Sequence, residues 1–515
     1  MPRIFNTTGP CHPERHYMLP PLGRMPQLHR LIEEWQYFIL HAPRQVGKTT
    51  AMMALARQLR ERGLVALHAS LLGARGMPEK AESEVVWLTS VALAAEIQLP
   101  EAQRPPSPDA VQASPPGTRL QHWLRSWCQE VKVPVVLLLD EADAVQGEAM
   151  MSLLAQLRNG FDYRGPEVFP TSVGLIGLRS LRDYIVEVRG RPLAQSSPFN
   201  NAISLTLRNF NREEVASLYA QHTDDTGQLF LPETVDAVMY WTGGQPLLVN
   251  ALARHAVGEL VPDRTLPIRP EHIEQSKDAL IGARVTHLDH LAERLNEPRV
   301  ARILLPILLG EGEIASTTDD FEYCVDLGLI HRSPVVAVSN PIYREVLARQ
   351  LTQSQNDALP ELGQRWRLPN GQLDFAALIE AFRQFWRENA DILMEQGGLY
   401  REAAPQLVLM AFLQRVVNGG GRITREYAAG RGRIDLLIEL RGGRHVVEMK
   451  RARSDATLSR ARRDGLEQLG GYLDSTGVSE GWLLIFDLRA ERSWEERLWS
   501  EDLEQDGKIL HLRGV

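Results

Sequence analysis

The sequence predicts a multidomain α/β protein whose largest domain is a parallel sheet with helices on both faces. Its 515 residues exceed what a single hydrophobic core accommodates. Short apolar strands alternate with helical patterns in the N-terminal part, at residues 37–40, 64–71, 133–139 and 171–178. Such alternation is typical of a parallel sheet, because each helix must cross back over the sheet before the next strand begins.

The bulk composition narrows the class of protein. A net charge of −8 excludes a polycation, so any nucleic-acid contact would have to come from a local basic patch. Cys11, Cys128 and Cys324 are isolated, which argues against a disulfide framework or a cysteine zinc site. No apolar run approaches the ~18 residues of a membrane span, and the N-terminus lacks a signal-peptide pattern. We therefore expect a soluble cytoplasmic protein with no membrane partner.

Five segments are expected along the chain. The first 30 residues are rich in Pro, Arg and His and are predicted to be irregular. An apolar hairpin pattern at 329–338 suggests a small winged-helix-like unit, and two β-like runs joined by Arg441–Arg444 predict a hairpin near the C-terminus. The predicted domains are the sheet domain (1–200), a helical lid (201–285), the winged-helix-like unit (286–352), a helical connector (353–397) and a second α/β domain (398–515).

A phosphate-binding loop follows the first strand. His41 to Thr50 matches the pattern G-x-x-x-x-G-K-[ST], except that Ala42 replaces the first glycine. Gly47 lets the backbone approach phosphates, Lys48 reaches the β- and γ-oxygens, and the Thr49 hydroxyl is suited to Mg²⁺. The predicted cofactor-binding residues of this loop are Pro43, Arg44, Gln45, Val46, Gly47, Lys48, Thr49 and Thr50.

Two acids end the third of these strands, Val133 to Leu139. Asp140 is predicted to hold the Mg²⁺ shell and Glu141 to polarise an attacking water. The strand places both at the carboxyl edge of the sheet, where ligands of α/β proteins bind. Alone, either motif has a plain alternative, a chance loop tripeptide or a solvated helix start. Their occurrence together, each with its strand, favours a nucleotide site.

The loop and the acidic strand resemble those of AAA-type and STAND-type ATPases over about residues 20–350. The resemblance implies ATP and Mg²⁺ as cofactors. It also implies that Pro246, in Thr242–Leu248, contacts nucleotide from the lid, although a plain turn is the alternative there. Arg179 stands where the group carries a polar sensor. An arginine finger would imply a homo-oligomer, and Arg158 and Arg164 are its candidates.

A second constellation lies near the C-terminus. Asp435 and Glu448 are predicted on neighbouring strands, where two carboxylates can hold Mg²⁺ or Mn²⁺. Lys450 lies two residues after Glu448 and therefore on the same strand face. A metal there would activate water against a phosphodiester. Glu-x-Lys alone is a weak signal, because both residues are abundant on strand surfaces.

Residues 398–490 resemble the PD-(D/E)XK nucleases, which implies a restriction-endonuclease-like α/β domain. Glu402 would be an additional acidic metal ligand, although an ordinary helix-start carboxylate is the alternative. Gln468 and Tyr472 are four residues apart on one helical face and resemble the Gln-x-x-x-Tyr motif of the exonuclease-like branch. The implied catalytic residues are Asp435, Glu448, Lys450, Gln468 and Tyr472, with Glu402, Asp435 and Glu448 as metal ligands.

The local charge favours a phosphate-rich ligand in this region. Residues 401–464 hold 14 Lys and Arg against 7 Asp and Glu. A solvated helix face is the plain alternative. We therefore predict an ATPase that gates or drives a metal-dependent nuclease acting on DNA, of a kind that resembles prokaryotic proteins of mobile elements or genome defence. The alternatives are a STAND-like nucleotide switch and a DNA-binding loader without nuclease activity.

Overall fold

The computed structural model divides the chain into two compact units, Met1–Arg344 and Glu345–Val515, and each is described by itself. The structure describes residues 2–77, 79–177, 202–283, 288, 291, 293–308, 318–332, 336–347, 373–396, 409, 412–413, 421–429, 432–440, 443–489 and 491–515. For 296, 305, 308, 389–396, 421–429, 432–435 and 440 it describes the backbone alone. Glu402, Arg179 and residues 353–372 and 397 of the predicted connector lie outside these residues. The finer division into five domains remains a prediction.

A five-stranded parallel sheet forms the core of the first unit; the sequence predicts four of its strands and misses β7 (Ile203–Thr206), which lies at the start of the predicted helical lid. Its strand order is β4-β5-β6-β3-β7. The β3 strand precedes the phosphate loop, and β6 separates it from β5, the acidic strand. The strands are β3 (Phe38–His41), β4 (Val65–Ser70), β5 (Val135–Asp140), β6 (Ser172–Gly177) and β7 (Ile203–Thr206).

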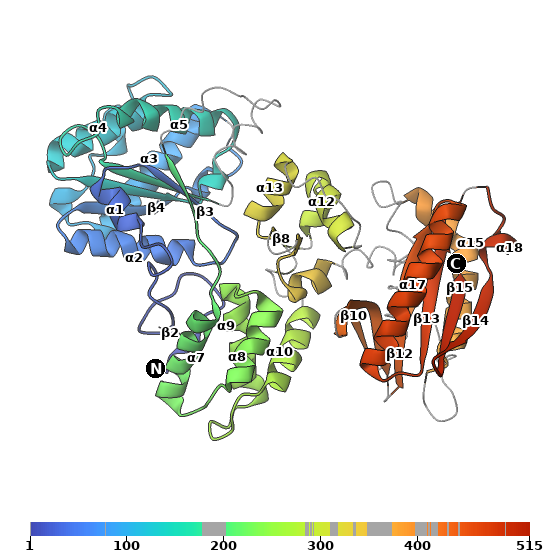
Figure 1. The fold of residues 1–515 in the computed structure, drawn as a ribbon. Coiled ribbons are helices and arrows are strands. Elements are labelled where there is room, and N and C mark those ends of the chain that lie inside the picture. Colours follow the sequence, from blue (N-terminus) through green and yellow to red (C-terminus); the bar gives the residue numbers. More distant parts are fainter. Residues whose placement is uncertain are drawn as a thin grey trace. The chain divides into compact units, whose positions relative to one another are not determined.

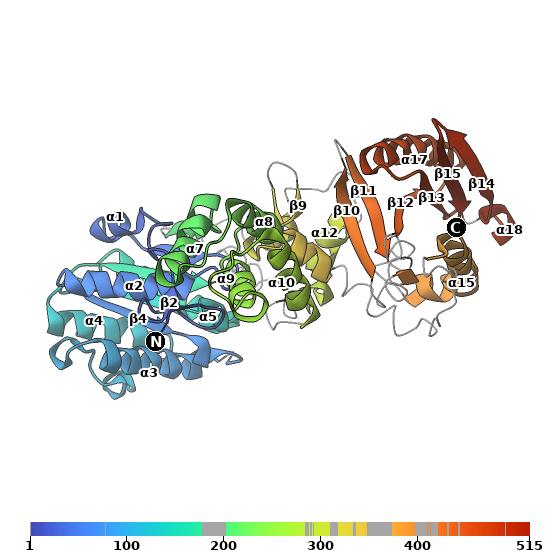
Figure 2. The same ribbon diagram turned by 90° about the horizontal axis from the view of Figure 1, so that it is seen from below.

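Helices cover both faces of this sheet (Figures 1 and 2). Phe38 and Leu40 pack with α1 (Leu28–Glu33) and α2 (Lys48–Glu61) on one face. Tyr37 and Ile39 point to the opposite face and pack with the other helices, as the two-residue period of a strand requires. Those helices are α3 (Lys80–Gln98), α4 (Arg119–Val131) and α5 (Gly147–Phe161).

Helices follow the sheet along the rest of the first unit. Asn211 caps the first of them through a capping box with Glu214, and Gly227 ends it at a φ of 77°, the left-handed conformation that favours glycine. The elements are α7 (Arg212–Thr226), α8 (Pro232–Thr242), α9 (Pro246–His255), the π-helical turn Ala256–Leu260 and α10 (Pro270–Gly282), then α12 (Pro298–Leu308), α13 (Asp319–Asp326) and the antiparallel pair β8 (Ile330–His331) and β9 (Ala337–Val338).

The N-terminal segment is more ordered than the sequence predicts. Strands β1 (Ile4–Phe5) and β2 (His16–Tyr17) pair in parallel, and Phe5 packs against the rings of Tyr17 and Tyr219. Arg3 forms an ion pair with Asp225 of α7. Most of residues 2–27 is irregular, as expected, and only the two short strands were not predicted, because their order comes from packing on α7, which leaves no periodicity in the segment itself.

A six-stranded mixed sheet forms the second unit, with the order β10-β11-β12-β13-β15-β14. The predicted hairpin is β11 (Gly432–Leu440) and β12 (Gly443–Ala452), which pair antiparallel, and β12 pairs in parallel with β13 (Glu480–Asp487). Three further strands of this sheet were not predicted: β10 (Gly421–Ala429), β14 (Ser500–Gln505) and β15 (Lys508–Gly514).

Two helices cover opposite faces of the second sheet (Figure 2). Leu483 and Ile485 of β13 pack with α17 (Asp455–Thr476). Trp482 and Phe486 alternate with them and contact α15 (Phe375–Gln396). Within the part of the chain that the structure describes, every helix is too short or too polar to span a lipid bilayer.

Candidate functional site

The phosphate loop leaves β3 and enters α2 through two residues of left-handed backbone. Gln45 has a φ of 60° and Gly47 a φ of 100°, so a side chain at position 47 would be strained. Gly47 is also the N-cap of α2. The loop therefore delivers the unpaired N–H groups of a helix start toward one point, which is the arrangement that binds phosphate.

Lys48 is turned back onto the loop. Its Nζ donates to the carbonyl oxygens of Ala42 at 2.6 Å and Pro43 at 2.8 Å. Burial lowers the pKa of Lys48 to about 8, although the carboxylates of Asp143 and Asp140 oppose this shift. Because its acceptors carry no formal charge, Lys48 is a cation poised to accept an anionic ligand.

Asp140 lies at the end of β5 beside the first residues of α2. Its Oδ2 accepts a hydrogen bond from Thr49 Oγ1 at 2.7 Å and contacts His68 Nε2 at 3.0 Å. Burial raises the pKa of Asp140, but hydrogen bonds with His68 and Thr49 outweigh it and hold the pKa below its ordinary value. The pair Thr49 and Asp140 presents two hard oxygen donors, a combination that fits Mg²⁺.

Glu141 adopts a left-handed backbone with a φ of 56°. This strained conformation turns its side chain toward β4, where the Ser70 hydroxyl donates to Glu141 Oε2. Strand register explains the proximity, because Ser70 pairs with Asp140 across the sheet. The carboxylate that the sequence assigns to water activation is therefore held by a neighbouring strand.

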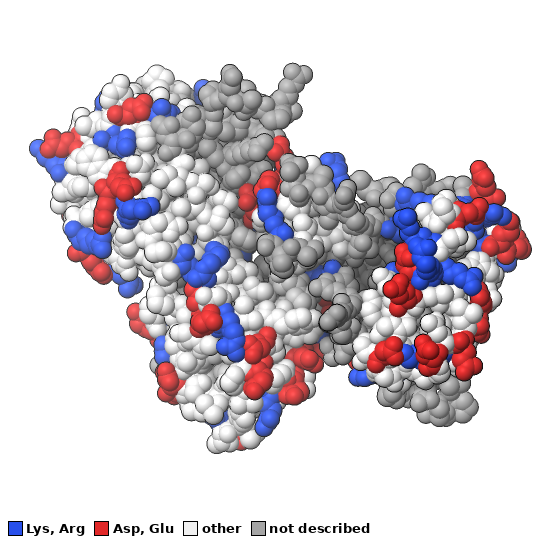
Figure 3. All heavy atoms as spheres, viewed as in Figure 1, with Lys and Arg blue, Asp and Glu red and all other residues white. Residues whose placement is uncertain are grey.

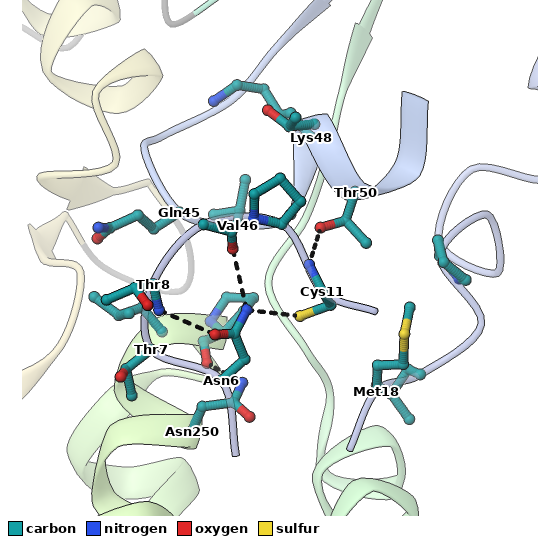
Figure 4. A pocket seen from close by; sticks show the side chains of 18 of the residues that line it. Asn6, Thr7, Thr8, Cys11, Met18, Gln45, Val46, Lys48, Thr50 and Asn250 are labelled. Atoms are coloured by element: carbon teal, nitrogen blue, oxygen red, sulfur yellow. Dashed lines mark hydrogen bonds between the residues drawn. The ribbon is translucent and has the colours of Figure 1, made fainter. Parts of the chain in front are cut away.

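A cavity of about 410 Å³ opens above the loop, within the size range of small-molecule sites. Figure 4 shows Lys48 at one end and Asn6, Thr7 and Asn250 at the other. The cavity brings together most of the predicted residues of the first unit: Gln45, Val46, Gly47, Lys48, Thr49, Thr50, Asp140, Glu141 and Pro246. Pro43 and Arg44 do not line it; Pro43 packs on Gly328 instead, and the carbonyl of Arg44 accepts from Gln245.

The N-terminal segment supplies a large part of the cavity wall, which the sequence reading missed. The Cys11 backbone N–H donates to Thr50 Oγ1 at 3.1 Å, which ties this segment to α2. No motif indicates this role, and only the density of Pro, Arg and His in the segment could have suggested it. The missed wall residues are Asn6–Cys11, Tyr17–Pro21, Arg24, His68, Ser70, Phe210, Leu218, Leu247 and Asn250.

The two arginine-finger candidates make contacts within the chain. Arg158 pairs with Asp162 at 2.8 Å, and Arg164 donates to the carbonyl of Trp35 at 2.7 Å. Neither lines the cavity. A role in a neighbouring copy would require each to release its present partner, and both assignments stay predictions.

The C-terminal cluster lies where β12 faces α17. Lys450 Nζ donates to Glu448 Oε1 at 2.5 Å and to Gln468 Oε1 at 2.7 Å. Glu448 is 2 % exposed, whereas Gln468 lies at the surface. Tyr472 packs into the core under α17. Lys450 thus contacts both Glu448 and Gln468, and Tyr472 lies one helical turn from Gln468.

Asp435 is described by its backbone only. It precedes Leu436, and Leu436 pairs with Val447, which precedes Glu448. The two acidic residues therefore occupy neighbouring backbone positions on adjacent strands. Among the side chains that the structure describes, no group of three or more His, Cys, Asp or Glu residues could hold a metal ion; Glu402 and the Asp435 side chain lie outside that set.

Basic side chains gather over α17 on the surface of the second unit (Figure 3). Arg453, Arg460, Arg462 and Arg463 are exposed. Arg462 pairs with Glu501 at 2.5 Å and Arg463 with Asp464 at 3.2 Å. Part of the patch is thus neutralised locally, which reduces its attraction for a polyanion.

Comparisons with known proteins agree with the N-terminal site. Residues 33–185 match the family model of the AAA domain, and residues 375–490 match a domain of unknown function, DUF8371. No curated protein matches the chain.

Solved structures with a similar arrangement include a Walker-type ATPase of Pyrococcus abyssi, PABY2304, with 14 % identity and a TM-score of 0.47, covering 67 % of this chain and 99 % of that one. The ORC2 protein of Aeropyrum pernix has 12 % identity and a TM-score of 0.41, covering 65 % and 95 %. The Holliday junction branch migration motor RuvB of Thermotoga maritima has 15 % identity and a TM-score of 0.33, covering 62 % and 90 %. With its loop, its acidic strand and its match to the AAA model, the region of residues 33–185 is similar to AAA-type P-loop ATPase domains.

Proposed function

We propose that the first unit binds Mg²⁺-ATP in the cavity above the phosphate loop and hydrolyses it. The observation that carries this proposal is the 2.7 Å contact between Thr49 Oγ1 and Asp140 Oδ2 beside Lys48. It brings two hard oxygen ligands and a cation to the start of α2, where helix N–H groups converge.

Each residue has a separate task in this proposal. Lys48 leaves the carbonyls of Ala42 and Pro43 and binds the β- and γ-phosphates. Thr49 and Asp140 hold Mg²⁺, which supplies charge neutralisation at the phosphates. Glu141 leaves Ser70 and orients a water for attack on the γ-phosphate, and Pro246 contacts the nucleotide from α9.

Glu141→Gln tests the hydrolytic part. The amide keeps the size of the side chain but cannot accept a proton, so we expect ATP affinity within about twofold of wild type and turnover at least about 100-fold slower. Titration with a fluorescent ATP analogue and a phosphate-release assay measure the two. Normal turnover would remove Glu141 from this role.

We propose in addition that the second unit cleaves DNA phosphodiester bonds. The supporting observation is the cluster of Glu448, Lys450 and Gln468, with Asp435 next to Glu448 across the strand pair. Asp435 and Glu448, assisted by Glu402, would hold Mg²⁺ or Mn²⁺, which supplies an activated water. Lys450 would offset charge at the phosphate, Gln468 would position its ammonium group, and the exposed arginines over α17 would bind the DNA backbone.

The test is a cleavage assay on linear and circular, single- and double-stranded DNA. It is run with Mg²⁺ or Mn²⁺, with and without ATP, on wild type, Asp435→Ala and Lys450→Ala. Lys508→Ala is the matched control, because Lys508 pairs with Asp474. We expect cutting that both cluster variants lose and the control keeps, with its rate changed by ATP. DNA binding without cutting would favour the switch or loader function instead.

A further inference from the structure

Arg24 joins two parts of the first unit that belong to different elements. It precedes α1, and its guanidinium donates to the carbonyl of Val46 in the phosphate loop at 2.8 Å and to the carbonyl of Arg208 at 2.6 Å. It also lies over the ring of Phe210, 4.7 Å from the centroid. One side chain therefore touches both the loop and the segment that follows β7.

That segment, residues 207–211, connects strand β7 of the sheet to α7, the first of the helices α7–α10. It is fastened to the turn before α9, because the Phe210 N–H donates to the carbonyl of Gly244 at 2.9 Å and Asn209 donates to that of Gly243 at 3.1 Å. Pro246, one of the cavity residues, starts α9 directly after this turn. A displacement of residues 207–211 would therefore move the α9 wall of the cavity.

The charge of Arg24 has no counter-ion within ion-pair distance among the described residues, although the carboxylate of Glu214 stabilises it from further away. Among the residues that the structure describes, Arg24 makes no ion pair, and Glu214 is engaged by Arg208. Both acceptors of Arg24 are neutral carbonyls, and burial lowers its pKa to about 10. Its Nη2 lies 3.1 Å from where a Cβ of Gly47 would stand. A half-buried cation against the loop is stabilised when an anion occupies the loop and destabilised when the loop is empty.

We propose that Arg24 is a positioning residue that couples occupancy of the phosphate loop to the segment 207–211 and thus to the α9 wall. This inference rests on the proposed binding of ATP. Phosphates in the loop compensate the guanidinium charge and tighten the bridge Val46–Arg24–Arg208. The bridge then holds residues 207–211, and with them Gly243 and Gly244, against the loop. Without nucleotide the bridge is weaker, and residues 207–211 separate from the phosphate loop more often.

Hydrogen exchange of the full chain tests the coupling. The probe is the Phe210 amide with its neighbours in residues 207–211, measured with and without Mg²⁺-ATP. The variants are Arg24→Met, which removes the charge, and Arg24→Lys, whose compact ammonium lacks the planar fork that reaches both carbonyls. Arg30→Met is the matched control, since Arg30 lies on the same N-terminal stretch and its side chain is 70 % exposed.

We expect ATP to slow exchange in residues 207–211 of wild type and Arg30→Met at least about fivefold. Arg24→Met and Arg24→Lys should bind ATP within about tenfold of wild type and lose this ATP-dependent slowing. An unchanged slowing in Arg24→Met, with ATP bound, would overturn the coupling and leave the proposed function standing. Failure of wild type to bind ATP would overturn both. Faster exchange throughout α7 and α9 of Arg24→Met without ATP would show a purely structural role and would also overturn the coupling.

Discussion

The cavity above the phosphate loop and the C-terminal cluster differ in how their charges are satisfied. In the cavity, Lys48 donates to two neutral carbonyls and makes no ion pair among the described residues. In the cluster, Lys450 is already paired with Glu448 at 2.5 Å. The cavity is therefore arranged to receive an anion, whereas the cluster is internally neutralised and must rearrange before a metal or a phosphate enters.

The two sites also differ in how far apart their parts lie in the sequence. The cavity wall joins the N-terminal segment to Asn250 of α9. The cluster comes from β12 and the helix that follows it, with Lys450 and Gln468 only 18 positions apart. A site assembled from distant segments responds to changes in any of them, whereas a local cluster depends on few neighbours.

The largest effect is expected from Lys48→Ala. Removing the ammonium group leaves a bound triphosphate without its main cationic partner, so ATP affinity should fall at least about 100-fold, equivalent to about 2.8 kcal/mol. Lys450→Ala, the corresponding change in the cluster, should leave ATP affinity unchanged. Titration with a fluorescent ATP analogue measures both. Equal losses in the two variants would contradict the division of the chain into separate sites.

A smaller effect is expected from Gly328→Ala, a residue outside the cavity. Gly328 has a φ of +71°, and a Cβ there would lie 2.3 Å from Pro43 Cγ. The added methyl group must displace Pro43, whose carbonyl accepts from Lys48, so ATP affinity should fall about tenfold, or about 1.4 kcal/mol.

Gly227→Ala is the matched control for this change. Its φ is +77° and a Cβ there meets nothing within 4 Å, so it introduces similar backbone strain without the clash. An equal loss of affinity in the control would mean that strain, and not displacement of the loop, is responsible.

The sequence revealed the parts of each site that are continuous in the chain. The loop, the acidic strand and the hairpin with Glu448 and Lys450 are local patterns, and each lies on the predicted element. Four strands of the parallel sheet were predictable for the same reason, because they are largely apolar runs. The fifth, β7, is exposed at three of its four positions and was missed.

The remainder depends on tertiary contacts that no local pattern encodes. The N-terminal segment takes its order from Phe5 packing on Tyr219, more than 200 positions away in the sequence. The link between Glu141 and Ser70 follows from strand register. In β14, Ser500–Gln505, acidic residues occupy half of the positions because an edge strand exposes both faces, so the alternation that marks a strand is lost.

Ser70→Ala tests whether the hydrogen bond from Ser70 restrains Glu141 in the cavity. The change frees Glu141 from the hydroxyl of Ser70 without removing any group that we assign to phosphate binding. We expect basal ATP turnover to rise about two- to fivefold, or by about 0.4–1 kcal/mol in the activation barrier, with ATP affinity unchanged. Ser126→Ala, which removes a helix-surface hydroxyl bonded to the carbonyl of His122, is the control. A fall in turnover would mean that Ser70 positions Glu141 for catalysis.

The smallest expected effect is on the pH dependence of stability. It concerns two histidines, one in each unit. His222 bonds Gln228 at 3.0 Å. His445 stacks on Phe375 with a centroid distance of 4.5 Å, and its buried Nδ1 has no hydrogen-bond partner among the described residues. Burial lowers the pKa of both imidazoles; Glu480 partly opposes this for His445, and the hydrogen bond to Gln228 does so for His222.

A histidine whose folded pKa is lowered binds fewer protons in the folded state than in the unfolded chain. The protein therefore keeps its full stability above the unfolded pKa of about 6.5. It loses stability as the pH falls below that value, because the unfolded chain then binds the proton more readily. His445→Phe keeps a ring against Phe375 and removes the titration. We expect the urea midpoint of wild type to fall more between pH 8 and pH 5.5 than that of His445→Phe, while His222 titrates equally in both. Equal falls would mean that protonated His445 is accommodated without loss, and that α15 is held to the sheet by its other contacts.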